Sequence, residues 1–413
     1  YTQSFRAEDN VAYDSGELVI HTTLATWQHS SGDSRNGQII ERPFADQFGN
    51  EIIYRICRFE FDRLELIGDL KVQVKGGNAL EIVTTSGDII VSSDLDLSGG
   101  IPTGAIPGVG GPGGFSGGEV GGRGIGPGGG LGGVVPGGGG YGGAGSHATS
   151  TTGQPYGDGS LRHLLGGSGG GGFTVDTAGG GGGGALRLES AGLLRLNSAI
   201  RSLGGSGSGG AAGGSGGAVH LIGKSLELST NSQIDTSGGY NGGAGGRIFL
   251  EAETAIANSG FNNLINRGGD GAIPGTSGSL RYLRSSTLSE LNFQTGTLVI
   301  DTDTAMITHS SGKIAYGEIS DHFYKDDNGA YWPYSVCRFA FTNIRLGGNL
   351  VVVLQGGNAL MLEALSGDLI LGANLRADGG ASNLENGGVP VLGGFAGSDS
   401  GERAGNGPGA PSY

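Results

Sequence analysis

The stretch Gly179–Leu196 reads GGGGGGALRLESAGLLRL, and it joins two patterns that favour different structures. Its six glycines end a tract, Gly99–Gly184, in which 41 of 86 residues are glycine and only five are charged. The leucines that follow alternate with other residues, which is typical of a half-buried β-strand. Because an ordered glycine costs roughly 0.5–1 kcal/mol more than alanine, packing must offset a large cost if the tract is ordered. The tract is therefore either a spacer or a set of closely packed backbones.

The strand pattern recurs along the chain. Residues 185–205 are followed by a second copy at 218–239 and by the start of another at 247–251, and residues 78–100 carry the same pattern. Each full copy has three short apolar runs, small turn residues and then glycines. Short strands repeated at this spacing are typical of a parallel β-solenoid, whose successive coils lie roughly 4.8 Å apart.

We therefore expect an all-β fold of parallel β-solenoid segments with essentially no helix and with glycine-rich excursions after the third strand of a coil. The alternatives are a β-sandwich and separate small barrels. A sandwich would need hairpin turns of the Asn-Gly or Asp-Gly type, and these are scarce between the strands. Within the glycine tract, Gly108, Gly111, Gly114 and Gly117 follow a spacing of three. The interrupted period excludes a collagen helix and leaves polyglycine-II-like segments packed side by side. We expect the tract to be largely ordered.

A longer repeat organises the whole chain. Cys57-Arg-Phe-Glu-Phe61 returns as Cys337-Arg-Phe-Ala-Phe341, and His29-Ser-Ser-Gly32 returns as His309-Ser-Ser-Gly312, both at an offset of 280 residues. The chain is thus one full unit and the first part of the next. The expected segments are edge strands and loops (1–51), the solenoid start (52–98), the glycine tract (99–184), further coils (185–280), the second unit (281–378) and a second glycine tract (379–413).

Composition limits the classes of partner. A net charge of -14 at pH 7 argues against nucleic acid and anionic membranes as partners. No apolar run is long enough to insert into a membrane. The chain opens at Tyr1 without an apolar leader, so we expect a mature or internal piece of a longer protein. The acidic composition is compatible with self-association and with surface polysaccharide as a partner.

Few residues are candidates for a site. Asp326, Asp327 and Asn328 could offer oxygen ligands to a hard cation, although a plain turn explains them as well. Cys57 and Cys337 are most simply small buried residues, and the alternative is a covalent link between neighbouring units or chains. We expect no catalytic residues, no cofactor and no metal centre.

The succession CRFEFDRLELIGDLKVQVKGGNALEIVTTSGDIIVSSDLDLSGG and GGGGGGALRLESAG, with the landmarks Ser146-His147-Ala148-Thr149 and Tyr156-Gly157-Asp158, resembles a family of glycine-rich repeat proteins. These are large surface or secreted proteins of environmental bacteria that look like parallel β-helices. The resemblance implies an extracellular or cell-surface location and a structural or adhesive role, and it carries no catalytic residues.

The sequence therefore predicts a non-enzymatic building block of an extracellular fibre, stalk or surface adhesin. The alternative is a carbohydrate-binding or carbohydrate-active β-helix protein, for which Asp88, Asp94 and Asp96 would be the acidic candidates. Asp94 and Asp96 become Asn374 and Arg376 in the second copy, so turn residues are the simpler interpretation. An ice-binding protein would need threonines at coil spacing, which the sequence lacks.

Overall fold

The computed structural model describes residues 10–46, 51–149, 151–157, 159–258, 263–284, 290–325 and 331–377. These residues form strands, turns and extended segments, with no α-helix among them. The chain divides into two compact units, residues 1–280 and 281–413. The all-β class expected from the sequence is confirmed, whereas the sheets are mixed and unclosed, so a complete parallel solenoid is not shown.

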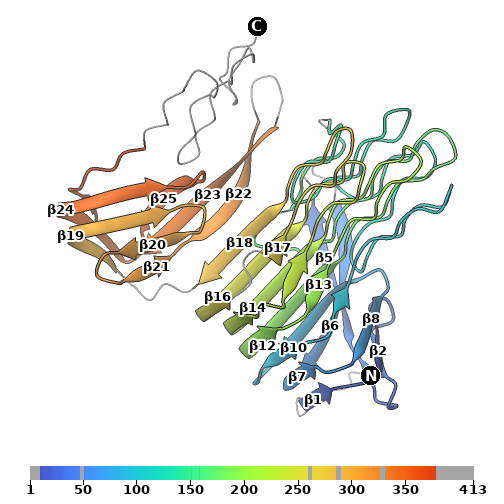
Figure 1. The fold of residues 1–413 in the computed structure, drawn as a ribbon, viewed down its shortest axis with the longest axis horizontal. Helices are drawn as coiled ribbons and strands as arrows, with labels where there is room; N and C mark the ends of the chain where they lie inside the picture. Colours follow the sequence, from blue (N-terminus) through green and yellow to red (C-terminus); the bar gives the residue numbers. More distant parts are fainter. Residues whose placement is uncertain are drawn as a thin grey trace, which may run out of the picture. The chain divides into compact units, whose positions relative to one another are not determined.

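The main sheet of unit 1 stacks the sequence copies as parallel neighbours (Figure 1). Strand β12 (Ala185–Leu196) pairs with β14 (Ala218–Leu228), which pairs with β16 (Arg247–Asn258). Leu188 and Leu221 are Cα partners, and each is 0% exposed. The alternating leucines therefore form a continuous apolar core along the stack, as the sequence pattern predicts.

On its other side, β12 contacts two strands at once. Its first half pairs with β9 (Ala79–Thr84) and its second half with β10 (Ile89–Val91), both in parallel. Strand β6 (Glu51–Phe61) follows β9, and β5 (Gln38–Ala45) is the antiparallel neighbour of β6. In the chain, the glycine tract 99–184 thus lies between β9 and β10 on one side and β12, their neighbour in the sheet, on the other.

The remaining strands of unit 1 extend this sheet or form two others. Strands β1 (Asn10–Tyr13) and β7 (Arg63–Leu66) continue the main sheet beyond β10. A parallel sheet contains β11 (Leu95–Asp96), β13 (Ala199–Arg201), β15 (Gln233–Asp235) and β17 (Leu264–Ile265). A mixed sheet contains β2 (Glu17–His21), β3 (Thr26–His29), β4 (Ser34–Asn36) and β8 (Lys71–Lys75). Antiparallel pairing of β3, β4 and β5 corrects the purely parallel expectation, because connections of a few residues permit only antiparallel neighbours.

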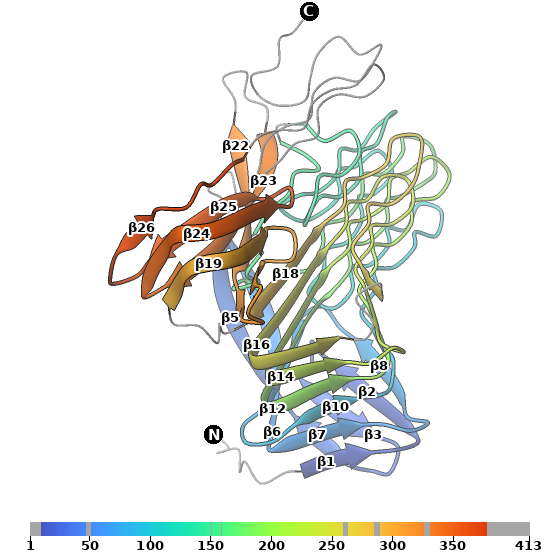
Figure 2. The same ribbon diagram turned by 60° about the vertical axis from the view of Figure 1, so that its left-hand side comes forward.

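The glycine-rich segments of unit 1 run side by side in a layer that adjoins the strands (Figure 2). We call residues 97–145, 166–184, 202–217 and 236–246 the glycine layer. At its centre, the N–H groups of residues 179–184 donate in turn to three different segments at 2.8–3.0 Å. The bonds run from Gly179 and Gly182 to Gly118 and Phe115, from Gly180 and Gly183 to Ala212 and Ser215, and from Gly181 and Gly184 to Gly100 and Leu97. A period of three is that of a polyproline II helix, whereas a strand has a period of two.

Glycine is required in this layer because backbones lie against one another. A Cβ atom added at Gly180 would lie 2.0 Å from the carbonyl oxygen of Gly205, and one at Gly182 would lie 2.0 Å from that of Gly167. Real Cβ contacts are essentially never shorter than 3.0 Å, and a hydrogen-bonded backbone cannot move aside as a side chain can. The described part of the glycine tract is therefore a packed layer and not a spacer.

Unit 2 repeats the pairings of unit 1. Its strands are β19 (Glu290–Asp301), β20 (Met306–His309), β21 (Ile314–Tyr316), β22 (Glu318–Lys325), β23 (Tyr331–Phe341), β24 (Asn343–Gln355), β25 (Ala359–Ala364) and β26 (Leu369–Leu371). Phe339 pairs with Leu362 between β23 and β25, just as Phe59 pairs with Ile82 between β6 and β9. The predicted second glycine tract, 379–413, lies outside the described residues. Strand β18 (Ser279–Arg284) crosses the boundary between the units.

Candidate functional site

A row of polar side chains crosses the parallel strands of unit 1. Cα register places Arg58 of β6 beside Glu81 of β9, Glu81 beside Arg187 of β12, and Arg187 beside His220 of β14. Each of these residues is the middle member of an apolar–X–apolar triplet, so it points away from the leucine core. We call these four residues the polar row.

Glu81 is the buried centre of the polar row. It is only 4% exposed, and both its carboxylate oxygens are engaged. Arg58 Nη1 donates to Oε2 at 3.3 Å, and Arg187 Nη1 donates to Oε1 at 3.1 Å. A buried carboxylate without such partners would be strongly destabilising, so the two arginines are what permits an acid at this position.

The next pair in the row is fixed just as closely. Arg187 Nε donates to His220 Nδ1 at 3.2 Å, and its Nη2 donates to the carbonyl oxygen of Leu161 at 2.7 Å. Since Nδ1 accepts, the proton of the neutral imidazole is on Nε2, which lies 3.3 Å from Glu251 Oε2. His220 also stacks on Phe249, with ring centroids 4.6 Å apart. Arg187 is therefore held in one orientation by three separate hydrogen bonds.

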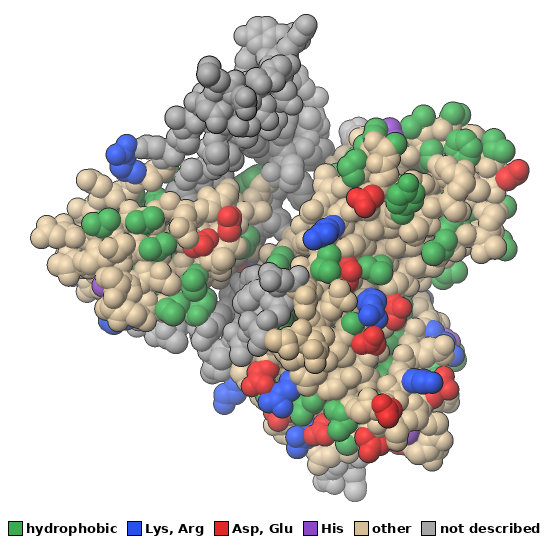
Figure 3. All heavy atoms as spheres, in the orientation of Figure 1, with side chains coloured by type: hydrophobic (Ala, Val, Ile, Leu, Met, Phe, Trp, Pro, Cys, Tyr) green, Lys and Arg blue, Asp and Glu red, His purple; other side chains and the backbone are tan. Residues whose placement is uncertain are grey.

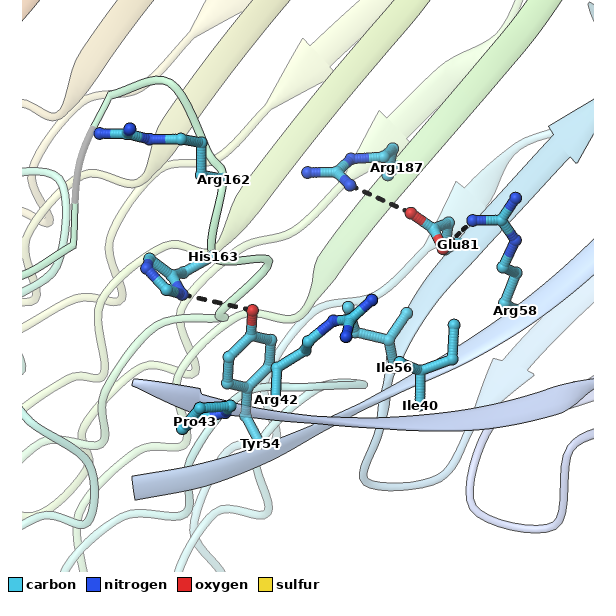
Figure 4. Close-up of a pocket in the computed structure, with 10 residues that line it drawn as sticks. All are labelled: Ile40, Arg42, Pro43, Tyr54, Ile56, Arg58, Glu81, Arg162, His163 and Arg187. Carbon is cyan, nitrogen blue, oxygen red and sulfur yellow. Dashed lines mark hydrogen bonds and ion pairs between the residues drawn. The ribbon is translucent and has the colours of Figure 1, made fainter. Parts of the chain in front are cut away.

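Beside the polar row lies a cavity of about 410 Å³ (Figure 4). We call it the basic pocket, because four arginines and a single glutamate contribute to its walls. Its lining residues are Ile40, Arg42, Pro43, Tyr54, Ile56, Arg58, Glu81, Arg162, His163 and Arg187. They come from strands β5, β6, β9 and β12 and from the segment that crosses Leu161. A cavity of this size falls within the roughly 300–1,000 Å³ of small-ligand sites.

The two ends of the basic pocket differ in chemistry. At one end, the Tyr54 hydroxyl lies 3.4 Å from His163 Nδ1, and burial raises the pKa of this phenol, which stays protonated at neutral pH. At the other end is the ion-paired Glu81. Figure 4 shows Arg42 reaching from β5 into the space between these ends, whereas the Arg162 guanidinium points away from the others.

The surface of unit 1 is divided in the same way. Charged side chains gather over the strands, whereas the glycine layer presents mainly backbone and apolar side chains (Figure 3). Ile106, Val109 and Val134 of the layer are 68%, 70% and 73% exposed. The glycine layer thus contributes little of the charge that a polar ligand would meet.

The structure places the two cysteines in the cores of separate units. Cys57 and Cys337 are free and 0% exposed, and burial raises the pKa of each thiol to about 12. This burial favours the interpretation as small apolar core residues. A covalent link to another chain stays a prediction, for which the core around either thiol would have to open.

The acidic candidates are dispersed. Asp326, Asp327 and Asn328 lie outside the described residues. Asp88 accepts the Leu193 backbone N–H at 2.8 Å. Asp94 accepts the Ala199 N–H at 2.9 Å and pairs with Arg201 at 3.0 Å. These two aspartates therefore link turns of neighbouring strand copies.

The repeated histidines have a local role as well. His29 Nε2 donates to the carbonyl oxygen of Ser15 at 2.9 Å while the ring stacks on Tyr13, 4.2 Å away. His309 makes the corresponding bond to Thr295 at 2.8 Å and stacks on Phe293 at 4.1 Å. Both imidazoles close a hairpin and face an aromatic ring.

Sequence reasoning missed the basic pocket, although part of its signal was present. Aligned strand copies put Glu81, Arg187 and His220 at the same place in their triplets. In-register parallel stacking makes such residues neighbours, so the ion pair could have been inferred. Arg42 and His163 carry no such signal, because neither lies in a strand copy.

Comparison of the chain with protein-family models, curated proteins and solved structures yields no match. Among the described residues, no helix has the length and hydropathy needed to cross a membrane, and no three His, Cys, Asp or Glu side chains are grouped as metal ligands would be.

Proposed function

We propose that the chain is a non-enzymatic structural protein that builds an extracellular fibre, stalk or surface adhesin from 280-residue units. The observation that carries this proposal is the recurrence of one strand pairing in both units, Phe59 with Ile82 and Phe339 with Leu362. Repeats that present the same pairing surfaces add up along one direction, as in solenoid proteins. In this proposal the parallel stack is a stretch of β-solenoid and the glycine layer is a polyglycine-II-like bundle attached to it.

Two features support a structural role. The stack buries leucines in a continuous core, and the glycine layer joins its segments through backbone hydrogen bonds, which depend on neither salt nor side-chain chemistry. Apolar side chains such as Val109 and Val134 remain exposed on the layer and suit self-association with other copies. The location proposed with this role is the cell surface or the extracellular space.

Electron microscopy of the native material tests the proposal. Fibres or stalks with an axial repeat are expected, and discrete particles without axial order would contradict it. A parallel assay of the purified chain with polyuronides separates the structural role from an enzymatic one, because turnover would favour the carbohydrate-active alternative.

A second candidate function is carbohydrate binding, and the basic pocket is the observation that favours it. The pocket has the volume of a small-ligand site and combines arginines, a tyrosine hydroxyl and apolar walls. Surface polysaccharide is the partner this function implies, and a fibre subunit could also carry such a site.

A further inference from the structure

The basic pocket departs from the acidic character of the chain. The whole chain has a net charge of -14, yet four arginines and one glutamate line this cavity. The single carboxylate is consumed, since Arg58 and Arg187 occupy its two oxygens. A cleft with walls of one sign concentrates ions of the opposite sign.

Arg42 is the cation best placed to meet a ligand. It lies on β5, its side chain is exposed, and it forms no ion pair among the described residues. In Figure 4, the Arg42 guanidinium lies among the side chains that line the basic pocket, on the same side as Arg58. Arg58 uses Nε for Glu60 and Nη1 for Glu81, so three of its five N–H donors are left. Two guanidinium groups thus offer planar donor sets, which suit carboxylate, sulfate or phosphate oxygens.

The rest of the wall suits an organic body and not a bare ion. Ile40, Pro43 and Ile56 supply apolar surface next to Arg42. At the far end, the protonated Tyr54 hydroxyl and the His163 ring nitrogens offer hydrogen-bonding groups. A ligand that satisfies all of these groups has one anionic group, an apolar face and hydroxyl groups along its edge.

We propose that the basic pocket binds an acidic sugar residue, with its carboxylate or sulfate group on Arg42 and Arg58 and its ring between the apolar wall and Tyr54. This inference rests on the second candidate function, carbohydrate binding, and is independent of fibre formation. Glu81 and Arg187 act as positioning residues, because they hold the Arg58 guanidinium at the cavity wall through the shared carboxylate.

Two charged positions of the pocket differ between the two copies of the scaffold. At an offset of 280 residues, the chain has His322 where Arg42 stands and Met361 where Glu81 stands, whereas Arg58 returns as Arg338. The strand pairing is preserved between the units, while the side chains at these two pocket positions change. This difference is expected of a ligand site placed on a repeated frame and gives a natural internal control.

Isothermal titration calorimetry with the full 413-residue chain at low ionic strength tests the inference. The probes are glucuronic acid, glucose 6-sulfate, glucose and sodium sulfate. At least one acidic sugar is expected to bind about tenfold more tightly than either glucose or sodium sulfate, the size of one charge-assisted hydrogen bond. The tighter of the two acidic sugars identifies the anionic group.

Variants at matched positions assign the binding to the pocket. Arg42→Gln is expected to weaken acidic-sugar binding by about tenfold or more and to leave the unfolding curve unchanged. Arg55→Gln removes the same charge from β6 outside the pocket, where Arg55 pairs with Glu41 at 2.8 Å, and leaves binding unchanged. Arg42→Lys gives intermediate binding, because lysine keeps the charge and loses the planar fork.

Each alternative outcome overturns a defined part of the proposal. Equal binding of glucose and the acidic sugars would disprove recognition of the anion while leaving carbohydrate binding in place. Equal binding of sodium sulfate would disprove recognition of the sugar ring. Absence of binding by all four probes would reject both the inference and the carbohydrate-binding function, and equal losses in Arg42→Gln and Arg55→Gln would reject this pocket as the site.

Discussion

The strand stack and the glycine layer of unit 1 lie next to each other and are held together by different forces. In the stack, side chains such as Leu188 and Leu221 are fully buried, and neighbouring backbones are separated by ordinary strand spacing. In the layer, residues 179–184 have no side chain to bury, and their N–H groups donate in turn to carbonyl groups of three neighbouring segments. The stack is therefore stabilised by buried apolar area, and the layer by close backbone contact and hydrogen bonds.

The comparison shows that one chain can achieve close packing both with large apolar side chains, in the stack, and with glycines, in the layer. A methyl group added at a leucine position of the stack is partly accommodated by shifts of the neighbouring side chains. Adding one to Gly180 would place it 2.0 Å from a backbone oxygen that is itself part of the hydrogen-bonded layer. The two regions should thus respond differently to the smallest change in side-chain volume.

The largest effect is expected from Gly180→Ala in the centre of the layer. The added Cβ clashes with the Gly205 carbonyl at 2.0 Å, so we expect a loss of about 4 kcal/mol or more in the free energy of unfolding. Urea denaturation of the variant measures this loss. The control is Gly77→Ala, whose Cβ meets only Thr23 Oγ1 at 3.8 Å and which we expect to change stability by about 1 kcal/mol or less. Similar unfolding midpoints for the two variants would show that the layer is not closely packed.

A smaller loss is expected from truncation in the strand core. Leu221→Ala removes a fully buried side chain between β12 and β16 and should cost about 3 kcal/mol. The matched control is Val134→Ala in the glycine layer, where the side chain is 73% exposed and the expected change is within about 0.5 kcal/mol. Thermal unfolding of both variants measures the contrast, and a loss at Val134 as large as that at Leu221 would show that the layer also depends on side-chain burial.

The smallest expected effect is a loss of stability at acidic pH. A hydrogen bond from the Tyr13 hydroxyl lowers the pKa of Asp33, so the stability that this carboxylate contributes is present above its unfolded pKa and is lost as the pH falls below about 4. We expect at most about 1 kcal/mol, because Asp33 is partly exposed. Residues 179–184 contain no titratable side chain.

Segment-resolved hydrogen exchange at pH 5 and pH 3, corrected for intrinsic rates, compares the strands around Asp33 with residues 179–184. Protection around β3 and β4 should fall, whereas that of residues 179–184 should change less. Asp33→Asn should remove the part of the change that Asp33 causes. An identical pH response in the variant would assign the acid sensitivity to other groups.

The sequence pattern was sufficient to predict the all-β class and the strands that repeat. Alternation in residues 185–196 predicted β12 and its buried leucines, whereas the polyglycine-II-like packing suggested by the spacing of Gly108, Gly111 and Gly114 stays a prediction. The antiparallel neighbours β3 and β4 were not predicted, because their pairing depends on short turns and not on the repeat.

The site was less accessible to sequence reasoning for a physical reason. Glu81 and Arg187 become neighbours through strand register, which the aligned copies contain. Arg42 and His163 approach them only through the β5–β6 hairpin and the path of the glycine tract. No periodic pattern encodes where a long excursion returns to a sheet, so a pocket formed by such a return has no sequence signature.

The glycine tract separates β10 in the chain from β12, its neighbour in the sheet, and this separation has a consequence during synthesis. Asp88 and Leu193, which are joined by a hydrogen bond at this junction, are 105 residues apart in the chain. A ribosome adds about 5–20 residues per second, so β10 waits roughly 5–20 s for its neighbour to be made. Throughout that interval, the edge formed by Ile89 and Val91 lacks its later partner strand β12. The length of the glycine tract thus sets how long a nascent apolar sheet edge stays uncovered.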